Sequence, residues 1–298
     1  MSSGTFRTDI ASSLSATSAI GAAAASFGQA IGGDDFRFIQ RLVQERAGIV
    51  LADCKRHMVT GRLGRRLRQL GLADYAEYCA VLRNDTGDEL VEMINAITTN
   101  LTAFFRESHH FEYLTRTLLP ELVSTSQRRE IRIWSAGCST GEEAYSLAIA
   151  TKEALLDDAL PPTKILATDI DSNVLARAVS GVYEYGRVAD LGQERLKRWF
   201  LRGRGSHEGE VQVAPELRDL VAFRHLNLLS AWPMKRRFDA IFCRNVVIYF
   251  DKETQRRLFD RFADALNDNG HLFIGHSESL FNVSDRFRLI GRTVYRKR

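Results

Sequence analysis

A short glycine-containing turn between a predicted strand and a predicted helix has the residue types of a ligand-binding loop. It reads Gly137-Cys138-Ser139-Thr140-Gly141 and follows the apolar run at 131–134. Its small residues let a ligand approach the backbone, whose N–H groups can donate to polar atoms at such a junction. Asp169 ends the next predicted strand, where a carboxylate can accept hydrogen bonds from both hydroxyls of a ribose. The turn and the carboxylate together predict a cofactor that contains a nucleoside.

The spacing within the turn argues against a dinucleotide. Gly137 and Gly141 form Gly-x-x-x-Gly rather than the Gly-x-Gly-x-x-Gly pattern that approaches a pyrophosphate. Glu142 and Glu143 follow directly, and their negative charges would repel a pyrophosphate but suit a cationic cofactor. Acidic residues in a first turn also stabilise a helix through its dipole. We assign Glu142 to the cofactor and interpret Glu143 as a helix-stabilising residue.

The composition is that of a globular chain. Its 298 residues are 45% hydrophobic and 26% charged, which suits one large or two modest domains. The net charge of +4 is small for a protein that binds nucleic acid without sequence preference. The sequence has no run of about 20 strongly apolar residues, so we expect no membrane insertion. The cysteines have neither CxxC nor zinc-ligand spacing, which predicts no metal site, reduced thiols and a cytoplasmic location; they are Cys54, Cys79, Cys138 and Cys243.

The hydrophobic periodicity changes along the chain and predicts four parts. Residues 1–33 are rich in Ser, Ala and Gly and are expected to form a flexible tail rather than a signal peptide. Residues 34–96 show only helical periodicity and predict a small helical domain, and 97–128 predict a linker with a bridging helix. From 129 to 298 strands and helices alternate, which predicts a mostly parallel sheet covered on both faces. Within this part, about 200–222 is expected to form an inserted β subdomain.

Individual elements follow from the same patterns. Asp34 and Asp35 can cap the first helix, and Gly48 can end it. Asp171 can cap the helix expected at 172–179. The bridging helix is expected from Glu107 to Leu122. Further helices are expected at 55–70, 75–82, 88–97, 172–179 and 252–267, and from 142 onward. Strands are expected at 131–134, 164–169, 221–225, 238–243 and 271–275, with a terminal hairpin at 287–290 and 293–296.

Five segments of the sequence together form a specific pattern: TTNLTAFFRE from Thr98, WSAGCSTGEE from Trp134, ATDID from Ala167, CRNVVIYF from Cys243 and HSE from His276. These segments resemble the CheR-type chemotaxis receptor methyltransferases, and the similarity runs from about residue 34 to the C-terminus. The resemblance implies a Rossmann-like class I methyltransferase domain that uses S-adenosylmethionine, with a small all-helical N-terminal domain and a small antiparallel β subdomain inserted. It further implies that glutamate side chains of a chemoreceptor are methylated and that S-adenosylhomocysteine is released. Ala144 departs from the proline that the family often has, but both residues fit a helix's first turn.

The resemblance implies roles for individual residues. Arg106 and Tyr249 are implied to place the substrate carboxylate beside the methyl group, and Asp169 is implied to hold the ribose. His276-Ser277-Glu278 is interpreted as a structural turn. Together with the turn glycine, the expected cofactor-binding residues are Asn100, Thr102, Arg106, Gly137, Glu142, Asp169, Asn227, Leu228, Arg244 and Asn245.

Methyl transfer to a carboxylate has simple chemical requirements. A glutamate with a pKa near about 4.3 is already ionised at neutral pH, so the reaction needs no general base. Because an anion and a cation combine in line, the site should align them and exclude water. The planar fork of Arg106 can hold one carboxylate oxygen while the other attacks.

Two groups of arginines are candidates for docking a chemoreceptor's cytoplasmic domain. Four lie in the predicted helix at 55–70, mostly at spacings of three and four; the alternative is a solvated helix face. Two lie in the glycine-containing loop at 202–209, where some family members bind the receptor's C-terminal peptide by adding a strand; the alternative is a loop that only braces the fold. The helix group is Arg62, Arg65, Arg66 and Arg68, and the loop group is Arg202 and Arg204.

Two other functions fit the sequence less well. A methyltransferase for nucleic-acid bases typically has an Asn/Asp-Pro-Pro-aromatic motif, and the segment 245–249 lacks those prolines. A non-catalytic module that only senses the cofactor is disfavoured because Asn100, Arg106, Asp169 and Tyr249 are all present. We therefore expect an active, monomeric enzyme with a protein substrate and no nucleic-acid partner.

Overall fold

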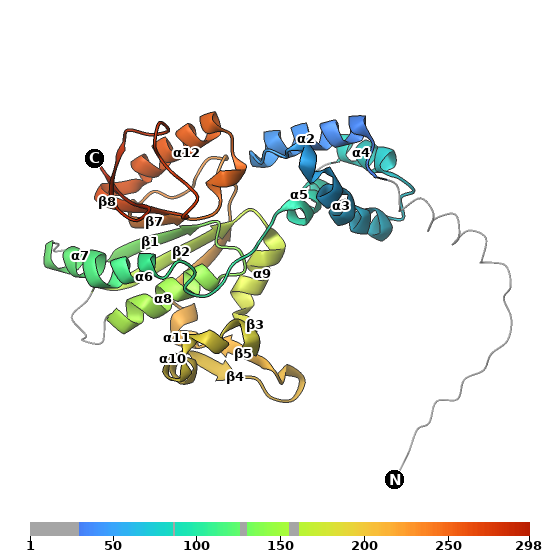
Figure 1. Cartoon of the computed structure of the whole chain (residues 1–298). Coiled ribbons are helices and arrows are strands. Elements are labelled where there is room, and N and C mark those ends of the chain that lie inside the picture. Colours follow the sequence, from blue (N-terminus) through green and yellow to red (C-terminus); the bar gives the residue numbers. More distant parts are fainter. Residues whose placement is uncertain (1–29, 86, 126–129, 155–160) are drawn as a thin grey trace, which may run out of the picture. The chain divides into compact units, whose positions relative to one another are not determined.

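The computed structural model describes residues 30–85, 87–125, 130–154 and 161–298 (Figure 1). They fall into two compact units, residues 30–39 with Ala52–Met93 and Gln40–Leu51 with Ile94–Arg298. Most of the predicted tail, residues 1–29, lies outside the described residues. The domain boundaries proposed from the sequence remain predictions. Among the described residues, no helix is both long and apolar enough to cross a membrane.

The smaller unit is all-helical, and its local sequence signals explain where the helices end. The side chain of Asp74 accepts a hydrogen bond from the backbone N–H of Glu77 (2.9 Å), and Gly71 ends a helix with φ +68°. Apolar side chains at helical spacing, such as Val59, Leu63 and Leu67, form its core. The helices are α2 (Gly33–Ala47), α3 (Arg56–Leu70), α4 (Tyr75–Arg83) and α5 (Asp88–Ile97), with a 3-10 turn at Asp53–Lys55; the last residues of α2 and α5 belong to the larger unit.

An ion pair closes the core of this helical unit. Arg66 on α3 donates to both carboxylate oxygens of Glu89 on α5, at 3.1 and 2.5 Å. The hydroxyl of Tyr78 donates to the same carboxylate at 2.7 Å. The hydrogen bond to Glu89 raises the pKa of Arg66, which opposes the effect of its partial burial. The charge of Arg66 is therefore paired within the helical unit, whereas the predicted docking residues Arg65 and Arg68 are exposed.

We expect Arg66→Met to lower the free energy of unfolding by about 2–4 kcal/mol, because it leaves the carboxylate of Glu89 buried without its cation. Arg65→Met on the same helix should change it by less than about 0.5 kcal/mol, since that side chain is exposed. Urea denaturation followed by circular dichroism measures both variants. Equal stability of the two variants would contradict this role of Arg66.

The larger unit contains a seven-stranded sheet in the order β6-β2-β1-β7-β8-β10-β9. Five neighbouring strands are parallel, and β10 runs antiparallel to both of its neighbours. The order reverses beside β1, which has β2 on one side and β7 on the other, and ligands of such sheets bind at this switch point. The strands are β1 (Ile131–Ala136), β2 (Thr163–Asp169), β6 (Val221–His225), β7 (Phe238–Cys243), β8 (Leu266–Ile274), β9 (Phe287–Gly291) and β10 (Val294–Lys297).

Helices cover both faces of this sheet (Figure 1). One apolar core joins the sheet to α6 (His109–Tyr113) and α8 (Glu142–Ala154), and a second joins it to α12 (Lys252–Ala265). Side chains of β7 alternate between the cores, with Phe242 in the first and Ile241 in the second. Because both faces are covered, β7 is buried along its whole length and is apolar except for Asp239.

A second, three-stranded sheet has the antiparallel order β3-β5-β4 (Figure 1). Its strand β3 (Val182–Glu184) was not predicted, because three residues are too few to show a period. Gly203 follows β4, and a Cβ there would lie 2.0 Å from the carbonyl oxygen of His207, so only glycine fits. The other strands are β4 (Phe200–Arg202) and β5 (Glu210–Val213), and α10 (Gln193–Trp199) and α11 (Pro215–Arg218) flank them in the sequence.

The fold class predicted from the sequence is confirmed: a helical unit accompanies a mixed sheet with parallel strands and a separate small antiparallel sheet. Two helices differ from their expected form. The bridging helix begins at His109 rather than Glu107 and contains a π-helical turn at Leu114–Leu118 before α7 (Leu119–Thr125). The helix expected at 252–267 ends at Ala265, because Leu266 already pairs with Phe238 in the sheet.

Candidate functional site

The turn after β1 is fixed by its neighbours. Gly137 has φ +89°, and a Cβ there would lie 2.4 Å from a methyl carbon of Val246. Gly141 has φ +95°, and a Cβ there would lie 2.9 Å from the Cβ of Ala178. Ser139 also adopts a left-handed conformation, with φ +49°. Both glycines are thus required by backbone conformation and by close packing.

Two aspartates at the end of β2 connect this turn to the segment before it. Backbone N–H groups of Ser139 and Asp171 donate to the carboxylate of Asp169 at 2.8 and 3.0 Å. Burial raises the pKa of Asp169, and these hydrogen bonds oppose the shift. Asp171 caps α9 (Ser172–Ser180), and its other carboxylate oxygen accepts from Asn100 at 2.8 Å and from Thr98 at 2.7 Å. The segment around Asn100 is therefore held against the carboxyl end of β2.

The backbone of Asn100 also meets the glycine turn directly, because its carbonyl oxygen accepts a hydrogen bond from the hydroxyl of Ser139 at 3.0 Å. Three segments far apart in the sequence thus lie together at the carboxyl ends of β1 and β2. They contain Asn100, Gly137 and Asp169, all of which the sequence assigned to the cofactor. Asp171, which was predicted only as a helix cap, is the side chain that joins two of these segments.

Glu142, also expected at the cofactor, is fully buried at the start of α8. Its carboxylate accepts hydrogen bonds from the hydroxyl of Thr140 at 2.6 Å and from the guanidinium of Arg187. Arg187 also donates to the carbonyl oxygen of Thr102 at 3.2 Å. One arginine thus contacts two expected cofactor residues. It could not be predicted from the sequence, because it lies in a connection without a recognisable motif.

Arg244 at the end of β7 has a buried guanidinium with three partners. It donates to the carboxylate of Glu143 at 3.1 Å and to the carbonyl oxygen of Arg106, and it lies 3.5 Å from the carboxylate of Glu107. Burial raises the pKa of Glu143, and Arg244 opposes the shift. The interpretation of Glu143 as only a helix-stabilising residue is therefore wrong, since its buried charge holds Arg244. Arg244 in turn holds the backbone of Arg106, whose side chain donates to the carbonyl oxygen of Leu101 at 2.9 Å.

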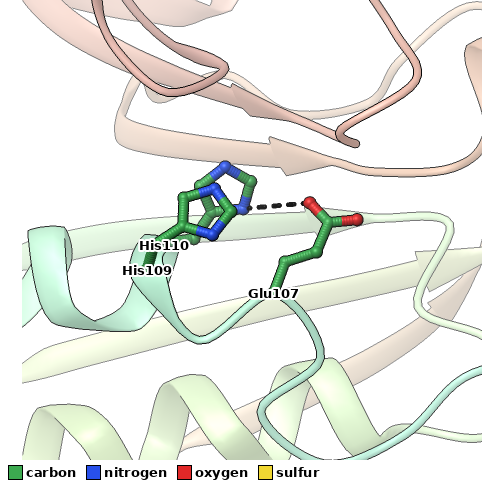
Figure 2. A group of neighbouring side chains, drawn as sticks. All are labelled: Glu107, His109 and His110. Carbon is green, nitrogen blue, oxygen red and sulfur yellow. Dashed lines mark ion pairs between the residues drawn. The ribbon is translucent and has the colours of Figure 1, made fainter.

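Glu107, the residue after Arg106, lies in a cluster with two histidines. Figure 2 shows its carboxylate directed toward His110, with 3.8 Å between Oε2 of Glu107 and Nδ1 of His110, and His109 beside that ring. The ligand atoms of these three residues lie within 4.8 Å of one another, which is close enough to hold a metal ion. The carboxylate already has a hydrogen bond with His276 at 2.8 Å and the charge of Arg244 nearby. Because its charge is already compensated, we interpret the cluster as part of the network around Arg106.

The pKa values in this cluster follow from its burial and its charges. Burial would raise the pKa of Glu107, but the hydrogen bond with His276 and the charge of Arg244 lower it to about 2. Burial and the charge of Arg244 lower the pKa of His110 to about 3. At neutral pH the cluster therefore contains an ionised carboxylate and a neutral His110.

One carboxylate, that of Glu278, holds the loop after β7 by binding two of its backbone N–H groups and the N–H of Gly275, which follows β8. Glu278 accepts hydrogen bonds from the N–H groups of Gly275, Asn245 and Ile248, at 2.5, 3.0 and 3.3 Å. Asn245 is left-handed, with φ +59°. The carbonyl oxygen of Tyr249 accepts from the backbone of Val50 at 2.8 Å. The expected catalytic Tyr249 therefore lies on a loop that Glu278 holds in place.

The loop after β6 carries the last two expected cofactor residues. The backbone N–H of Leu226 donates to the carbonyl oxygen of Asp169 at 2.9 Å, so the loop starts at the end of β2. Asn227 donates through its side-chain amide to the carbonyl oxygen of Arg46 at 2.6 Å. Leu228 is buried, and its carbonyl oxygen accepts from Arg261 at 2.6 Å.

The expected docking residues take no part in the hydrogen bonds described above for the cofactor residues. Arg202 and Arg204 are exposed on the small sheet and its loop, and Arg202 lies over the ring of Tyr185 at 5.8 Å. In the helical unit, Arg65 and Arg68 are exposed, Arg62 is half-buried and Arg66 binds Glu89, so Arg65 and Arg68 are the accessible members of that group.

Sequence comparison agrees with this fold and with a nucleoside-containing cofactor. Residues 100–296 match the family described as "CheR methyltransferase, SAM binding domain", and residues 34–98 match "CheR methyltransferase, all-alpha domain". The chain is thus a methyltransferase whose cofactor is S-adenosylmethionine, as the resemblance implied. This cofactor contains the nucleoside that the turn and Asp169 predicted. It belongs to the CheR methyltransferase family, which confirms the resemblance found in the sequence.

Three relatives show how far the similarity extends. The "Chemotaxis protein methyltransferase" of Salmonella typhimurium is 49% identical over 266 residues, which cover 87% of this chain and 88% of that protein. The Escherichia coli protein of the same name is 48% identical, with 87% and 89% covered. "Chemotaxis protein methyltransferase 2" of Pseudomonas aeruginosa is 47% identical, with 88% and 92% covered.

We expect the buried neutral state of His110 to make the protein sensitive to acid. The folded-state pKa of about 3 lies below the ordinary 6.5, so the unfolded chain binds the extra proton and stability falls as pH drops below about 6.5. At pH 5 the loss from this one group is about 2 kcal/mol. His110→Gln should therefore lose less stability than the wild type between pH 7.5 and pH 5 in urea denaturation.

The exposed His57 provides the matched control, and His57→Gln should keep the wild-type loss of stability between the two pH values. A wild-type acid dependence in His110→Gln would refute this account of the cluster.

Proposed function

We propose that this enzyme transfers the methyl group of S-adenosylmethionine to glutamate side chains in the cytoplasmic domain of a chemoreceptor. The products are glutamyl methyl esters and S-adenosylhomocysteine, and the role is adaptation in bacterial chemotaxis. The observation that carries the proposal is that the relatives with 47–49% identity are chemotaxis protein methyltransferases. The held arginine at position 106 supports a carboxylate substrate.

The cofactor is proposed to lie across the carboxyl ends of β1 and β2. Asp169 accepts hydrogen bonds from the ribose, and Glu142 binds the positively charged end of the cofactor. Asn227 and Leu228 lie near the adenine, and the other expected contacts are Asn100, Thr102, Gly137 and Asn245. For Arg244, the bound guanidinium supports an indirect role, in which it positions the backbone of Arg106.

The substrate carboxylate is proposed to meet the methyl group between Arg106 and Tyr249. Since the carboxylate arrives ionised, these residues position it rather than remove a proton. Arg106 binds one oxygen and leaves the other free to attack in line with the departing sulfur. The backbone of Arg106 is held by Arg244 and that of Tyr249 by Val50, which supports a preorganised geometry.

We expect Arg106→Ala to lower kcat about 100-fold or more, and Tyr249→Phe to lower it about tenfold, because each removes a group that aligns the carboxylate. The measurement is transfer of a labelled methyl group to receptor membranes, counted as base-labile methyl esters. Nucleic acid serves as a second acceptor in the same assay. Wild-type turnover in Arg106→Ala, or label on nucleic acid, would contradict the proposed function.

Docking of the receptor is proposed to use two basic surfaces. The first, Arg65 and Arg68 on α3, can meet acidic residues of a helical receptor domain. The second, Arg202 and Arg204, lies at β4, an outer strand of the small sheet, where an acidic C-terminal peptide can add a further strand. The exposure of these four side chains supports both surfaces.

The two surfaces make different predictions with a receptor that lacks its C-terminal peptide. Charge reversal at Arg65 and Arg68 should raise KM about three- to tenfold for both the complete and the shortened receptor, and added salt should mimic it. Charge reversal at Arg202 and Arg204 should raise KM only for the complete receptor. Calorimetry should detect the isolated peptide binding to wild type but not to the second variant. Unchanged KM values would remove the corresponding surface.

A further inference from the structure

Arg187 makes contacts that the proposed chemistry does not use. It ends a 3-10 turn, Tyr185–Arg187, which follows β3 of the small sheet. Its guanidinium binds the carboxylate of Glu142 and the carbonyl oxygen of Thr102, at 3.2 Å for the latter. Both partners are residues that we assign to the cofactor, so this arginine lies where the cofactor's polar end is expected.

The carboxylate that Arg187 binds is in an environment that demands a cation. The side chain of Glu142 is fully buried, and among the described residues the only other donor to its carboxylate is the hydroxyl of Thr140 at 2.6 Å. Tyr183 packs nearby, donates to the carbonyl oxygen of Thr140, and has its pKa raised by burial and by the charge of Glu142. An ionised carboxylate without exposure is costly unless a cation compensates it. In the structure that cation is Arg187.

The cofactor brings a cation of its own. S-adenosylmethionine and S-adenosylhomocysteine both end in an α-amino group that is protonated at neutral pH. If that ammonium binds Glu142, two cations meet at one buried carboxylate and repel each other. The side chain of Arg187 is 43% exposed, so it can turn into water, whereas Glu142 cannot leave its site.

We propose that Arg187 is a displaceable counter-ion, which neutralises Glu142 in the cofactor-free enzyme and yields its place to the cofactor's ammonium group. This inference rests on the proposed role of Glu142 in the cofactor site. It assigns to Arg187 a negative effect on cofactor affinity, because binding must first break its ion pair. It also assigns it a positive effect on the stability of the cofactor-free enzyme.

The test compares two ligands by calorimetry on the full chain. S-adenosylhomocysteine carries the ammonium group, whereas 5′-methylthioadenosine shares the adenosine and the sulfur but lacks the ammonium and the carboxylate. For Arg187→Ala we expect the Kd of S-adenosylhomocysteine to fall about three- to tenfold, as a half-exposed ion pair no longer competes. The Kd of 5′-methylthioadenosine should stay unchanged, and the Tm without ligand should fall.

Two further variants make the result specific. Arg187→Gln keeps a donor for the carbonyl oxygen of Thr102 but loses the charge, so it should behave like Arg187→Ala and replaces it if that variant folds poorly. Arg177→Ala removes an exposed arginine of α9 and should match wild type with both ligands. The double variant Glu142→Gln/Arg187→Ala should bind S-adenosylhomocysteine with the same Kd as Glu142→Gln alone, because no carboxylate remains for Arg187 to neutralise.

The outcomes separate this inference from the function on which it depends. Weaker or unchanged binding of S-adenosylhomocysteine by Arg187→Ala would overturn the counter-ion role, since Arg187 would then hold the cofactor or ignore it. Unchanged binding by Glu142→Gln alone would instead overturn the assignment of Glu142 to the cofactor. Stronger binding of both ligands by Arg187→Ala would also refute the inference, because the effect would not depend on the ammonium group.

Discussion

The arrangement of the site depends on one buried guanidinium, that of Arg244. It neutralises Glu143 beside the glycine turn, lies near the ionised Glu107 and holds the carbonyl oxygen of Arg106. A charge with so little exposure is stable only when its partners are in place. The end of β7, the start of α8 and the segment with Arg106 therefore hold one another in position. The position of the expected catalytic arginine is therefore set by a second arginine that need not touch the substrate.

Acidic side chains organise the remaining segments in the same way. Glu278 holds the loop of Tyr249 through backbone N–H groups, and Asp171 holds the segment of Asn100 through side chains. These carboxylates are buried, so each loop conformation is coupled to the hydrogen bonds that keep the charge stable. The site is thus built from loops, yet its loops are tied to the sheet by charge-assisted hydrogen bonds.

Much of this organisation could be read from the sequence, because it depends on neighbours along the chain. Alternating periodicity located the parallel strands, the glycines located the turn, and Asp171 was correctly expected to cap a helix. The pairs that complete the site could not be read. Arg187 and Glu142 are 45 residues apart and Arg244 and Glu143 are 101 apart, and only the folded sheet brings such side chains together. Arg66 was grouped with a surface for the same reason, since spacing along a helix does not reveal Glu89 on another one.

The left-handed residues beside the site have a consequence for the protein's evolution. Ser139 and Asn245 adopt φ values of +49° and +59°, which residues other than glycine reach only at some energetic cost. Glycine at either position would relieve that strain. At position 139 it would remove the hydroxyl that donates to the carbonyl oxygen of Asn100, and at position 245 it would remove the side-chain amide beside Gly275. Substitutions that raise thermal stability would therefore be selected elsewhere in the chain. Ser139 and Asn245 would be kept, despite their strained backbone, for the contacts of their side chains.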